Sequence, residues 1–348
     1  MIPIRILSDD NVGSILDIRN TVTCTEKAYA LKADNQARLF PLISEDLHDG
    51  RADMDIKSGM LTGEDVFGLK LVSWFGDNER IGLPALTGLA MTFDLTNGFP
   101  KAIMNARHLT AMRTGAAGAV GVKHLAKPNS KTLLVVGTGF QATFQIAAAI
   151  SEVPSIERVY IFNPVRHESA VRFRYSIRAG LGRILNDVKE PGNSAWIQRV
   201  ESVDFIAVDN VMKALEEVDA VITATPSCKA SILNEWVRPG THFSCIGADR
   251  SGKQEIDEKI FERAIVFVDD IAQASTVGET QSAVRAGIID RNQLTEIGHL
   301  ILGRAKGRTS DKDITVFDST GIALQDLAVS KYLLSKAEEM NIGTVVHL

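Results

Sequence analysis

Apolar and polar positions follow different periods along the chain, and the change between them separates two regions. In the first region, Phe67–Trp74 and Gly88–Leu95 alternate with the period of two that strands show. Val12–Asp34 has a helical apolar pattern, and Asn97-Gly98 is a typical hairpin turn. With a short opening strand at Ile4–Leu7, this region is predicted to be rich in strands.

The stretch Asn105–Leu125 is predicted to be a helix with a face of small residues, because alanine and glycine recur through it. Glycine lowers helix stability, so its repeated use indicates close packing or ligand contact. The residues Lys127-Pro128-Asn129-Ser130 interrupt the pattern, and we place a domain boundary there.

After this boundary, short apolar runs alternate with helical stretches, as in a parallel sheet covered by helices on both faces. The predicted strands are Thr132–Val136, Arg158–Phe162, Phe205–Val208, Asp219–Thr223, His242–Ile246 and Ile265–Val268. The predicted helices are Gln141–Ser151, Val211–Glu217 and Ala323–Met340, and a last strand lies near Thr344–His347. Gly180–Trp196 shows no pattern and is predicted to be a loop. The fold class is therefore α/β, with a doubly wound parallel sheet and a second, α+β domain.

The sequence LLVVGTGFQATF between the first two strands of this sheet is typical of a dinucleotide-binding turn. Gly137 follows a strand, Gly139 comes two positions later, and Ala142 takes the third position of the fingerprint. Gly137 permits a tight turn, and Gly139 lets the backbone approach a pyrophosphate. The N-terminus of the following helix favours an anion. A Rossmann-type fold that binds NAD or NADP is therefore predicted.

The end of the second strand bears on the choice between these cofactors. An acidic residue is expected there for the ribose hydroxyls, but the strand ends at Asn163. Asn163 does not repel a 2′-phosphate, and Arg166 or Arg172 is placed to pair with one. This favours NADP(H) or dual use. The alternative, in which Arg166 is a solvated charge at a helix start, stays open.

Composition excludes several classes of function. The chain has 348 residues, enough for two domains, and its net charge of −5 with no basic block argues against nucleic acid or an anionic membrane as partner. Its three cysteines lie far apart, which fits a reducing cytoplasm, and no Cys/His spacing indicates a metal. Because the start lacks a signal-peptide pattern and no apolar run reaches membrane length, we expect a cytoplasmic protein.

Three positive residues lie in unusual places for surface charges. Lys70 interrupts an apolar strand, Arg113 lies in the small-residue helix, and Arg38 precedes an apolar turn. Such residues hold carboxylates, Arg bidentately, so they are candidates for binding an acidic small molecule. The alternative for each is a surface charge or a structural ion pair, and for Arg38 alone that alternative is preferred.

Asp249 follows the predicted strand His242–Ile246. In open α/β sheets the carboxyl ends of the strands carry the site, so its carboxylate is a candidate for moving a proton from an amine or a water. The alternative is a helix N-cap before Gly252–Ile256. His108, beside the small-residue helix, is more simply interpreted as structural.

Together these motifs resemble the ornithine cyclodeaminase/mu-crystallin family. The resemblance rests on NARHLTAMRTGAAGAVGVKHLA, LLVVGTGFQA, GADRSGKQEID, VFVDD with GETQSAV, and DITVFDSTGIALQDLA, and it extends from about Arg38 to the C-terminus. It implies a homodimer. It also implies a substrate and dimerisation domain of residues 1–128 and 321–348, and a Rossmann domain of residues 129–320.

The resemblance implies roles for individual residues as well. Arg38, Lys70 and Arg113 would hold the substrate carboxylate, and Thr320, in the Ser319-Thr320 turn, would close the site. Asp249 would be catalytic beside the reacting amine, together with Lys70. The cofactor would contact Gly137, Gly139, Phe140, Gln141, Asn163, Arg166, Thr223 and Thr225.

The reaction implied first is cyclodeamination, in which L-ornithine is oxidised at Cα, closes on its terminal amine, loses ammonia and is reduced to proline. Reduction of a ketimine or cyclic imine, or dehydrogenation of an amino acid such as alanine, uses half of that cycle and is the first alternative. A crystallin-like protein that binds the cofactor without turnover is the second. Arg51–Met60, and Ala85 after Leu83-Pro84, depart from the family pattern and leave the substrate side chain open.

Overall fold

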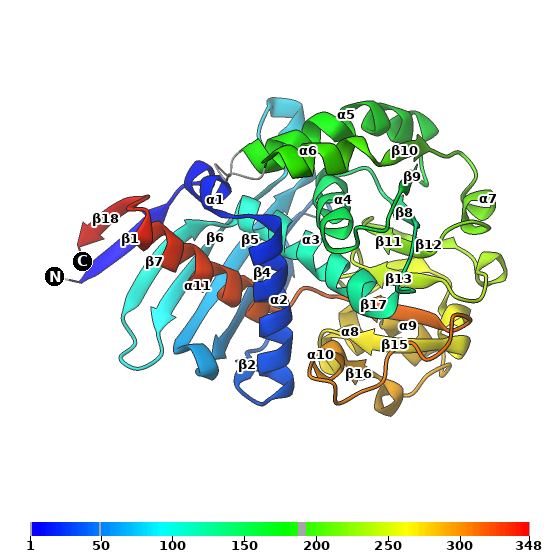
Figure 1. Cartoon of the computed structure of the whole chain (residues 1–348). Helices are drawn as coiled ribbons and strands as arrows, with labels where there is room; N and C mark the ends of the chain where they lie inside the picture. The colour runs from blue at the N-terminus through cyan, green and yellow to red at the C-terminus, as the bar shows by residue number, and fades with distance from the viewer. Residues whose placement is uncertain (1, 49, 187–192, 348) are drawn as a thin grey trace. The chain divides into compact units, whose positions relative to one another are not determined.

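The computed structural model describes residues 2–48, 50–186 and 193–347, which fold into two compact units (Figure 1). Unit 1 is formed by Met1–Arg113 and Ile322–Leu348, and unit 2 by Thr114–Gly321. Each unit is built around its own sheet, and the α/β class predicted from the apolar runs is confirmed. Among the described helices, none is both long and apolar enough to cross a bilayer.

Unit 1 is built on a mostly antiparallel sheet with the strand order β18-β1-β7-β6-β5-β4-β2, and β3 also pairs with β4. The strands are β1 (Pro3–Leu7), β2 (Ala37–Leu39), β3 (Ile43–Asp46), β4 (Ala52–Leu61), β5 (Val66–Phe75), β6 (Leu86–Asp94), β7 (Pro100–Asn105) and β18 (Thr344–His347). The helical segments are α1 (Asp9–Ile15), α2 (Ile18–Ala33), α11 (Ala323–Glu339), η1 (Thr62–Glu64) and η2 (Gly76–Ile81). Helix α11 packs against α2 and against β4 and β5, so it covers one face of the sheet.

The predicted strands and hairpin of this unit are confirmed, but two predictions need correction. The single helix predicted over Val12–Asp34 is two helices, because the side chain of Asp17 accepts the N–H of Asn20 at 2.8 Å and caps a new start. Strand β4 was not predicted. Its alternation is obscured by Asp53, Asp55 and Lys57, although Lys57 is buried.

Unit 2 is built on a parallel sheet with the order β10-β9-β8-β11-β13-β17-β15-β16. Its strands are β8 (Thr132–Val136), β9 (Arg158–Phe162), β10 (Asp204–Ala207), β11 (Ala220–Thr223), β13 (His242–Cys245), β15 (Ala264–Val268), β16 (Thr295–Glu296) and β17 (Ile314–Asp318), and β12 (Cys228–Ile232) pairs separately with β14 (Gln254–Ile256). The helices are α4 (Phe140–Glu152), α5 (His167–Asn186), α6 (Asn193–Glu201), α7 (Val211–Leu215), α8 (Ile271–Val277), α9 (Thr280–Arg285) and α10 (Ile297–Ile301), with η3 (Asn234–Trp236), η4 (Glu258–Arg263) and η5 (Arg291–Gln293).

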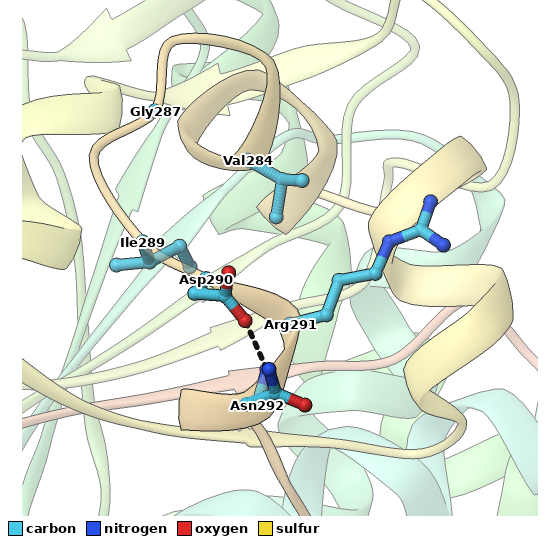
Figure 2. Close-up of a pocket in the computed structure, with 6 residues that line it drawn as sticks. All are labelled: Val284, Gly287, Ile289, Asp290, Arg291 and Asn292. Atoms are coloured by element: carbon cyan, nitrogen blue, oxygen red, sulfur yellow. Dashed lines mark hydrogen bonds between the residues drawn. The ribbon is translucent and has the colours of Figure 1, made fainter.

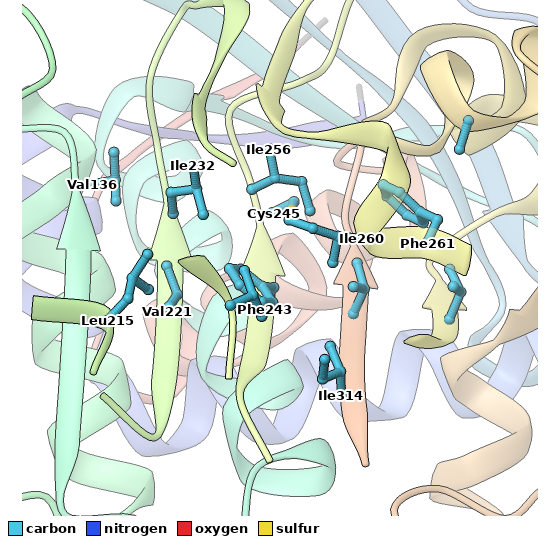
Figure 3. Close-up of a cluster of buried hydrophobic side chains, with 14 of the residues drawn as sticks. Val136, Leu215, Val221, Ile232, Phe243, Cys245, Ile256, Ile260, Phe261 and Ile314 are labelled. Carbon is cyan, nitrogen blue, oxygen red and sulfur yellow. The ribbon is translucent and has the colours of Figure 1, made fainter. Parts of the chain in front are cut away.

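The core of unit 2 explains why its strands are continuous apolar runs. Leu134, Val221, Phe243 and Val316 lie in register on four neighbouring strands, and all four side chains are fully buried. Figure 3 shows Val221 and Phe243 among the buried side chains of this core. A parallel sheet covered on both faces leaves no solvent side for polar residues. The strands predicted at Thr132–Val136 and its neighbours are therefore confirmed.

Helix α3 (Ala106–Leu125) contains the division between the two units, which falls at Arg113 and Thr114. The predicted boundary at Lys127–Ser130 lies later in the chain. The difference comes from the glycines of α3. A Cβ at Gly115 would lie 2.5 Å from the carbonyl oxygen of Phe144, and the Ser244 hydroxyl donates to Gly118 O at 3.0 Å. The small-residue face thus joins the second half of α3 to unit 2.

The predicted loop over Gly180–Trp196 is also corrected. Helix α5 continues to Asn186 and α6 begins at Asn193, while residues 187–192 lie outside the described part of the chain. Ile177, Leu181 and Ile184 are buried at helical spacing, but several arginines between them obscure that pattern.

Candidate functional site

The turn between β8 and α4 in unit 2 has the geometry that a dinucleotide requires. Gly137 has φ +114°, a conformation open to glycine, and a Cβ there would lie 2.5 Å from the carbonyl oxygen of Ala224. Gly139 is the N-cap of α4 and makes no side-chain capping bond, and a Cβ on it would meet no atom within 4 Å. The first turn of α4 therefore presents uncapped backbone beside open space, with its positive dipole end directed there.

The sheet order places this turn at a topological switch point. Strand β8 has β9 on one side and β11 on the other, so the chain leaves β8 in one direction and returns to the sheet in the other. In open α/β sheets ligands bind in the crevice outside the carboxyl ends of strands at such a point. Phe140 is exposed at the start of α4 and Gln141 is half-buried, while Ala142 is fully buried against the sheet.

The loop after β9 is organised by Asn163. Its amide donates to the hydroxyl of Thr138 at 2.7 Å, and its Oδ1 accepts the N–H groups of Val165 and Arg166 at 3.0 and 2.9 Å. The neutral amide thus ties the loop after β9 to the glycine turn. Arg166 is exposed at this loop.

Thr223 and Thr225, predicted on the nicotinamide side, lie at the end of β11 with their hydroxyls turned to a buried carboxylate. Both donate to Glu255 at 2.7 Å, and Glu255 also accepts the N–H groups of Thr225 and Gly247. Burial raises the pKa of Glu255, and the four hydrogen bonds, which lower it, do not cancel that effect. The two threonine side chains are therefore engaged inside unit 2, as are the N–H of Thr225 and the carbonyl of Thr223, which accepts the N–H of Ile246.

Two more carboxylates lie near Glu255, and together Glu255, Glu279 and Asp318 form what we call the acidic cluster. Glu279 accepts the N–H groups of Glu255 and Ile256 at 2.8 Å, and Asp318 accepts the N–H and hydroxyl of Thr280. Burial, and then the charge of Glu255, raises the pKa of Glu279 well above its usual range. Burial raises the pKa of Asp318 to about 7. The cluster therefore favours bound protons.

Asp249 and Thr320, the other predicted residues of unit 2, follow β13 and β17. The carboxylate of Asp249 lies 2.5 Å from the ammonium of Lys253, and its side chain is 43% exposed. Thr320 is buried, and its hydroxyl lies 3.0 Å from Asp269 Oδ1 and from Gln273 Oε1. Asp249 is thus accessible and salt-bridged, whereas Thr320 holds the loop after β15.

Unit 1 contains a buried group of charges that we call the cationic centre, formed by Lys57, Lys70, Arg113 and Asp326. The ammonium of Lys70 donates to Asp326 Oδ1 at 2.8 Å. The Nε of Arg113 lies 3.0 Å from the same oxygen without hydrogen-bond alignment. Lys57 stands opposite Lys70 in the register of β4 and β5. All four residues are buried, and two of the cations, Lys70 and Arg113, share one oxygen of Asp326.

The charges of the cationic centre perturb one another. Burial, and then the charge of Arg113, lowers the pKa of Lys70 to about 7, against the opposing effect of Asp326. For Asp326, burial alone would raise the pKa, but Lys70 and Arg113 overcome it and the net shift is downward. Lys70 is therefore poised between its charged and neutral forms near neutral pH.

Arg38 lies apart from this centre in unit 1. It is exposed on the edge strand β2, and its guanidinium lies 5.5 Å from the centre of the Phe40 ring. The described contacts join it to none of the residues of the cationic centre.

Comparison with known proteins identifies the family. Its model matches residues 5–183 and 178–341. The chain belongs to the ornithine cyclodeaminase/mu-crystallin family. The resemblance stated from the motifs is therefore confirmed.

Two relatives of the same family match over most of their length. Alanine dehydrogenase of Archaeoglobus fulgidus is 34% identical over 342 residues, covering 98% of this chain and 97% of that protein. A Δ1-pyrroline-2-carboxylate reductase of Bacillus cereus is 32% identical over 291 residues, covering 83% of this chain and 82% of that protein.

Two solved structures superpose on the whole chain. An archaeal alanine dehydrogenase dimer with bound NAD has a TM-score of 0.86 at 32% identity. The iminosuccinate reductase of Paracoccus denitrificans in complex with NAD+ has a TM-score of 0.87 at 29% identity. Each match covers 100% of both chains.

The sequence patterns did not predict that Lys57, Asp326 and the acidic cluster are buried charged groups of this protein. A signal for Asp326 was present, because it falls on the same helical face as Ala323, Ser330 and Leu333, all buried. Lys57 alternates in phase with Gly59 and Leu61, which are buried as well. Glu255 and Glu279 carried no such signal, since their partners are backbone N–H groups and, for Glu255, the hydroxyls of two threonines distant in the sequence.

An open pocket of about 530 Å³ lies elsewhere in unit 2 (Figure 2). Its lining runs from the end of α9 into η5: Val284, Gly287, Ile289, Asp290, Arg291 and Asn292. The carboxylate of Asp290 accepts the N–H of Asn292 at 2.8 Å, so its polar wall is engaged in capping η5. It contains none of the residues predicted for the site.

Proposed function

We propose that this protein is an NAD(P)(H)-dependent oxidoreductase that interconverts a 2-imino acid, open-chain or cyclic, and the corresponding amino acid. The observation that carries the proposal is the buried excess of positive charge in the cationic centre, within a chain that also has a dinucleotide turn. The names of the relatives support it, since alanine dehydrogenase and Δ1-pyrroline-2-carboxylate reductase both denote redox chemistry at a carbon bearing nitrogen and a carboxylate.

The charges of the cationic centre account for the carboxylate of such a substrate. Lys70 and Arg113 both meet one oxygen of the internal carboxylate of Asp326, so these three groups, when ionised, have an excess of one positive charge. Buried charges are tolerated when they are paired, and a substrate carboxylate offset by Lys70 and Arg113 reduces that excess. Arg38 stays a candidate for substrate binding, with a weaker case because it is exposed.

Lys70 is the proposed proton donor. Its side chain is 1% exposed, and its pKa of about 7 lets it exist in both forms under physiological conditions. Giving its proton to the imine nitrogen lowers the net charge of the centre by one, which the like-charged neighbours Lys57 and Arg113 favour. Exclusion of water from the centre also protects an imine from hydrolysis.

The dinucleotide supplies the hydride for the carbon of the C=N bond, or accepts it in the reverse direction. We propose that Gly137, Gly139, Phe140 and Gln141 hold its pyrophosphate at the α4 N-terminus, and that Thr223 and Thr225 lie on its nicotinamide side. We propose that Asn163 and Arg166 face the ribose. The neutral Asn163 permits NADP(H) as well as NAD(H).

Cyclodeamination of L-ornithine, the first interpretation from the sequence, becomes the second candidate. It needs Asp249 to move a proton at the terminal amine, and the accessible carboxylate of Asp249 favours it. The relatives described above are named for dehydrogenation and reduction, which supports the redox reaction more directly. Cofactor binding without turnover is the third candidate.

The test is a matrix of substrates and cofactors. Pyruvate with ammonia, Δ1-pyrroline-2-carboxylate, L-alanine, L-proline and L-ornithine are each incubated with NAD(H) and NADP(H). Net oxidation of the reduced cofactor with an imine, at a stoichiometry of one per amino acid formed, supports the proposal. Proline and ammonia from ornithine with catalytic NAD+ would establish cyclodeamination instead. Tight dinucleotide binding without turnover across the matrix would support the third candidate.

We also propose that two copies associate through the face of the unit 1 sheet that α11 leaves uncovered. Leu71 and Leu89 are paired across β5 and β6 on that face, and they are 37% and 50% exposed. Ile6 is exposed on β1, beside Ile103 of β7. A large exposed apolar patch is typical of an interface, and the similar alanine dehydrogenase is a dimer.

Light scattering after size exclusion tests this association. Leu71→Glu/Leu89→Glu is expected to convert a dimer to a monomer, because charges would be buried at the contact. Val165→Glu, an equally apolar-to-acidic change at an exposed residue of unit 2, is the control. A dimer that persists in the double variant would refute this interface.

A further inference from the structure

Asp326 occupies a position where a carboxylate is unfavourable unless it serves the groups it touches. It lies on the covered face of α11, between the buried side chains of Ala323 and Ser330, and is 2% exposed. Its partners come from elements far away in the sequence, since Lys70 lies 256 positions earlier. Removing a charge from water is costly, so this placement depends on the cations that meet it.

The contact has a particular form. Lys70 and Arg113 both approach Oδ1, while Oδ2 receives no hydrogen bond from any residue the structure describes. A structural arginine–carboxylate pair normally uses both oxygens and two parallel N–H groups. Here one oxygen instead meets two nitrogen atoms of different side chains, at 2.8 Å from Lys70 and 3.0 Å from Arg113.

We propose that Asp326 is a positioning residue of the active site, which holds the Lys70 ammonium beside the Arg113 guanidinium so that both engage the substrate and Lys70 donates its proton. The inference rests on the proposed function of the cationic centre. In the reduction, the C=N carbon gains a hydride from the reduced dinucleotide. The nitrogen gains the proton from Lys70 Nζ, which is left neutral beside Asp326.

The electrostatics of the centre make this role measurable. The charged groups that face Lys70 are Lys57 from β4, Arg113 from α3 and Asp326 from α11. Among them Asp326 is the one that favours the protonated ammonium, and the other two oppose it. Without the charge of Asp326, the charged neighbours that remain around Lys70 are both positive. Lys70 should therefore lose its proton at lower pH.

The experiment compares the wild-type protein with Asp326→Asn by two readouts. The first is NMR of protein labelled with [ε-13C]lysine, in which Lys70→Arg assigns the resonance and the titration midpoint of Lys70 is measured. The second is kcat/KM for imine reduction between pH 5 and 9. We expect the NMR midpoint and the high-pH limb of the rate profile to move down together by about one pH unit or more.

Two variants control for structural effects. Ser330→Ala changes a buried residue one turn along α11 and should leave both midpoints in place. Lys57→Met removes a repelling charge and should move them up. If Asp326→Asn does not fold, Lys57→Met/Asp326→Asn is compared with Lys57→Met, because the double variant loses one charge of each sign. The midpoint in the double variant should again be the lower one.

The outcomes separate this inference from the proposed function. An unchanged Lys70 midpoint in the Asp326 variants, with imine reduction intact in the wild type, would overturn the positioning role and leave the function standing. A wild-type protein that reduces no imine, but whose Lys70 midpoint falls on removal of Asp326, would refute the reaction and retain the pairing. A coupled shift of both readouts supports the two together.

Discussion

The two units bury ionisable groups in opposite ways. Unit 1 encloses the cations Lys70 and Arg113 on the carboxylate of Asp326, whereas the acidic cluster of unit 2 encloses carboxylates satisfied mainly by neutral hydroxyl and N–H donors. Burial disfavours the charged form in both, so the pKa of Lys70 falls to about 7 and that of Asp318 rises to about 7. The cost of burying a charge thus brings the pKa of a lysine down and that of an aspartate up to the same value near neutral pH.

The acidic cluster and the cationic centre differ in how many hydrogen bonds their buried carboxylates accept. Glu255 accepts four hydrogen bonds from residues of its own unit, so its environment is complete without a ligand. In the cationic centre, Lys70 and Arg113 meet one oxygen of Asp326, and its other oxygen accepts no hydrogen bond from a described residue. Asp318 of the acidic cluster also has one such oxygen, but no cation of the described chain is paired with it. We infer that buried charge serves structure in the acidic cluster and ligand binding in the cationic centre.

The largest expected effect is on catalysis by Lys70→Met. Removing the proposed proton donor and one carboxylate contact should lower kcat/KM for the imine by about 1000-fold, or about 4 kcal/mol. The free energy of unfolding should change little, because the loss of one ion pair is offset by relief of repulsion with Lys57 and Arg113. Steady-state kinetics and urea denaturation measure the two quantities, with Lys101→Met on β7 as control. Activity within tenfold of wild type would remove Lys70 from the mechanism.

The next effect is on stability, in Glu255→Ala. The hydroxyls of Thr223 and Thr225 and the N–H groups of Thr225 and Gly247 would lose their acceptor inside the core. We expect the free energy of unfolding to fall by about 3 kcal/mol. Urea denaturation measures it, and Glu262→Ala at an exposed position should cost less than about 0.5 kcal/mol. Equal losses in the two variants would contradict the structural role.

A smaller effect is the pH dependence of stability contributed by Asp318. Its pKa is about 7 in the folded protein and near 4 when unfolded, so the folded state binds the extra proton between those values. Its contribution is complete below about pH 4 and is lost as pH rises towards 7, by up to about 1 kcal/mol per pH unit. Asp318→Asn should flatten this slope in urea midpoints measured from pH 4.5 to 8. An identical slope in both proteins would show that Asp318 is ionised when folded.

The smallest effect is expected for Arg38→Ala. The guanidinium is exposed on an edge strand and stacks on Phe40, and such contacts contribute little in water. We expect kcat/KM to change by less than about threefold, or about 0.6 kcal/mol. A loss comparable to that of Lys70→Met would instead assign Arg38 to the carboxylate site, as the family resemblance implied.

Sequence patterns predicted the parts of this molecule that depend on local order. The strands of unit 2 are apolar because both faces of a parallel sheet are buried, and the glycine turn is determined by neighbours along the chain. Strand β4 was missed because charged residues interrupt its alternation, and Lys57 is buried where β4 pairs with β5 and packs against α11. The division within α3 was missed because it depends on contacts with Phe144 and Ser244.

The same reasoning explains what was found and missed in the candidate site. Lys70 and Arg113 are conspicuous as charges among small apolar residues. Asp326 becomes relevant only when α11 packs on β5, and the sequence alone does not show that the three converge. Thr223 and Thr225 were predicted near the cofactor, but the carboxylate that engages their hydroxyls lies 30 or more positions away in the sequence.

The discontinuity of unit 1 has a consequence for how the protein is made. Unit 2 is one uninterrupted segment, whereas unit 1 needs Ile322–Leu348 to complete its sheet with β18 and to bring Asp326 to Lys70. A ribosome delivers that segment only after all of unit 2. Unit 2 can therefore reach its native state while Met1–Arg113 still has its lysines hydrated. Emergence of Ile322–Leu348 is then the event that buries them, so a nascent chain stalled before α11 would carry a folded nucleotide-binding unit and no cationic centre.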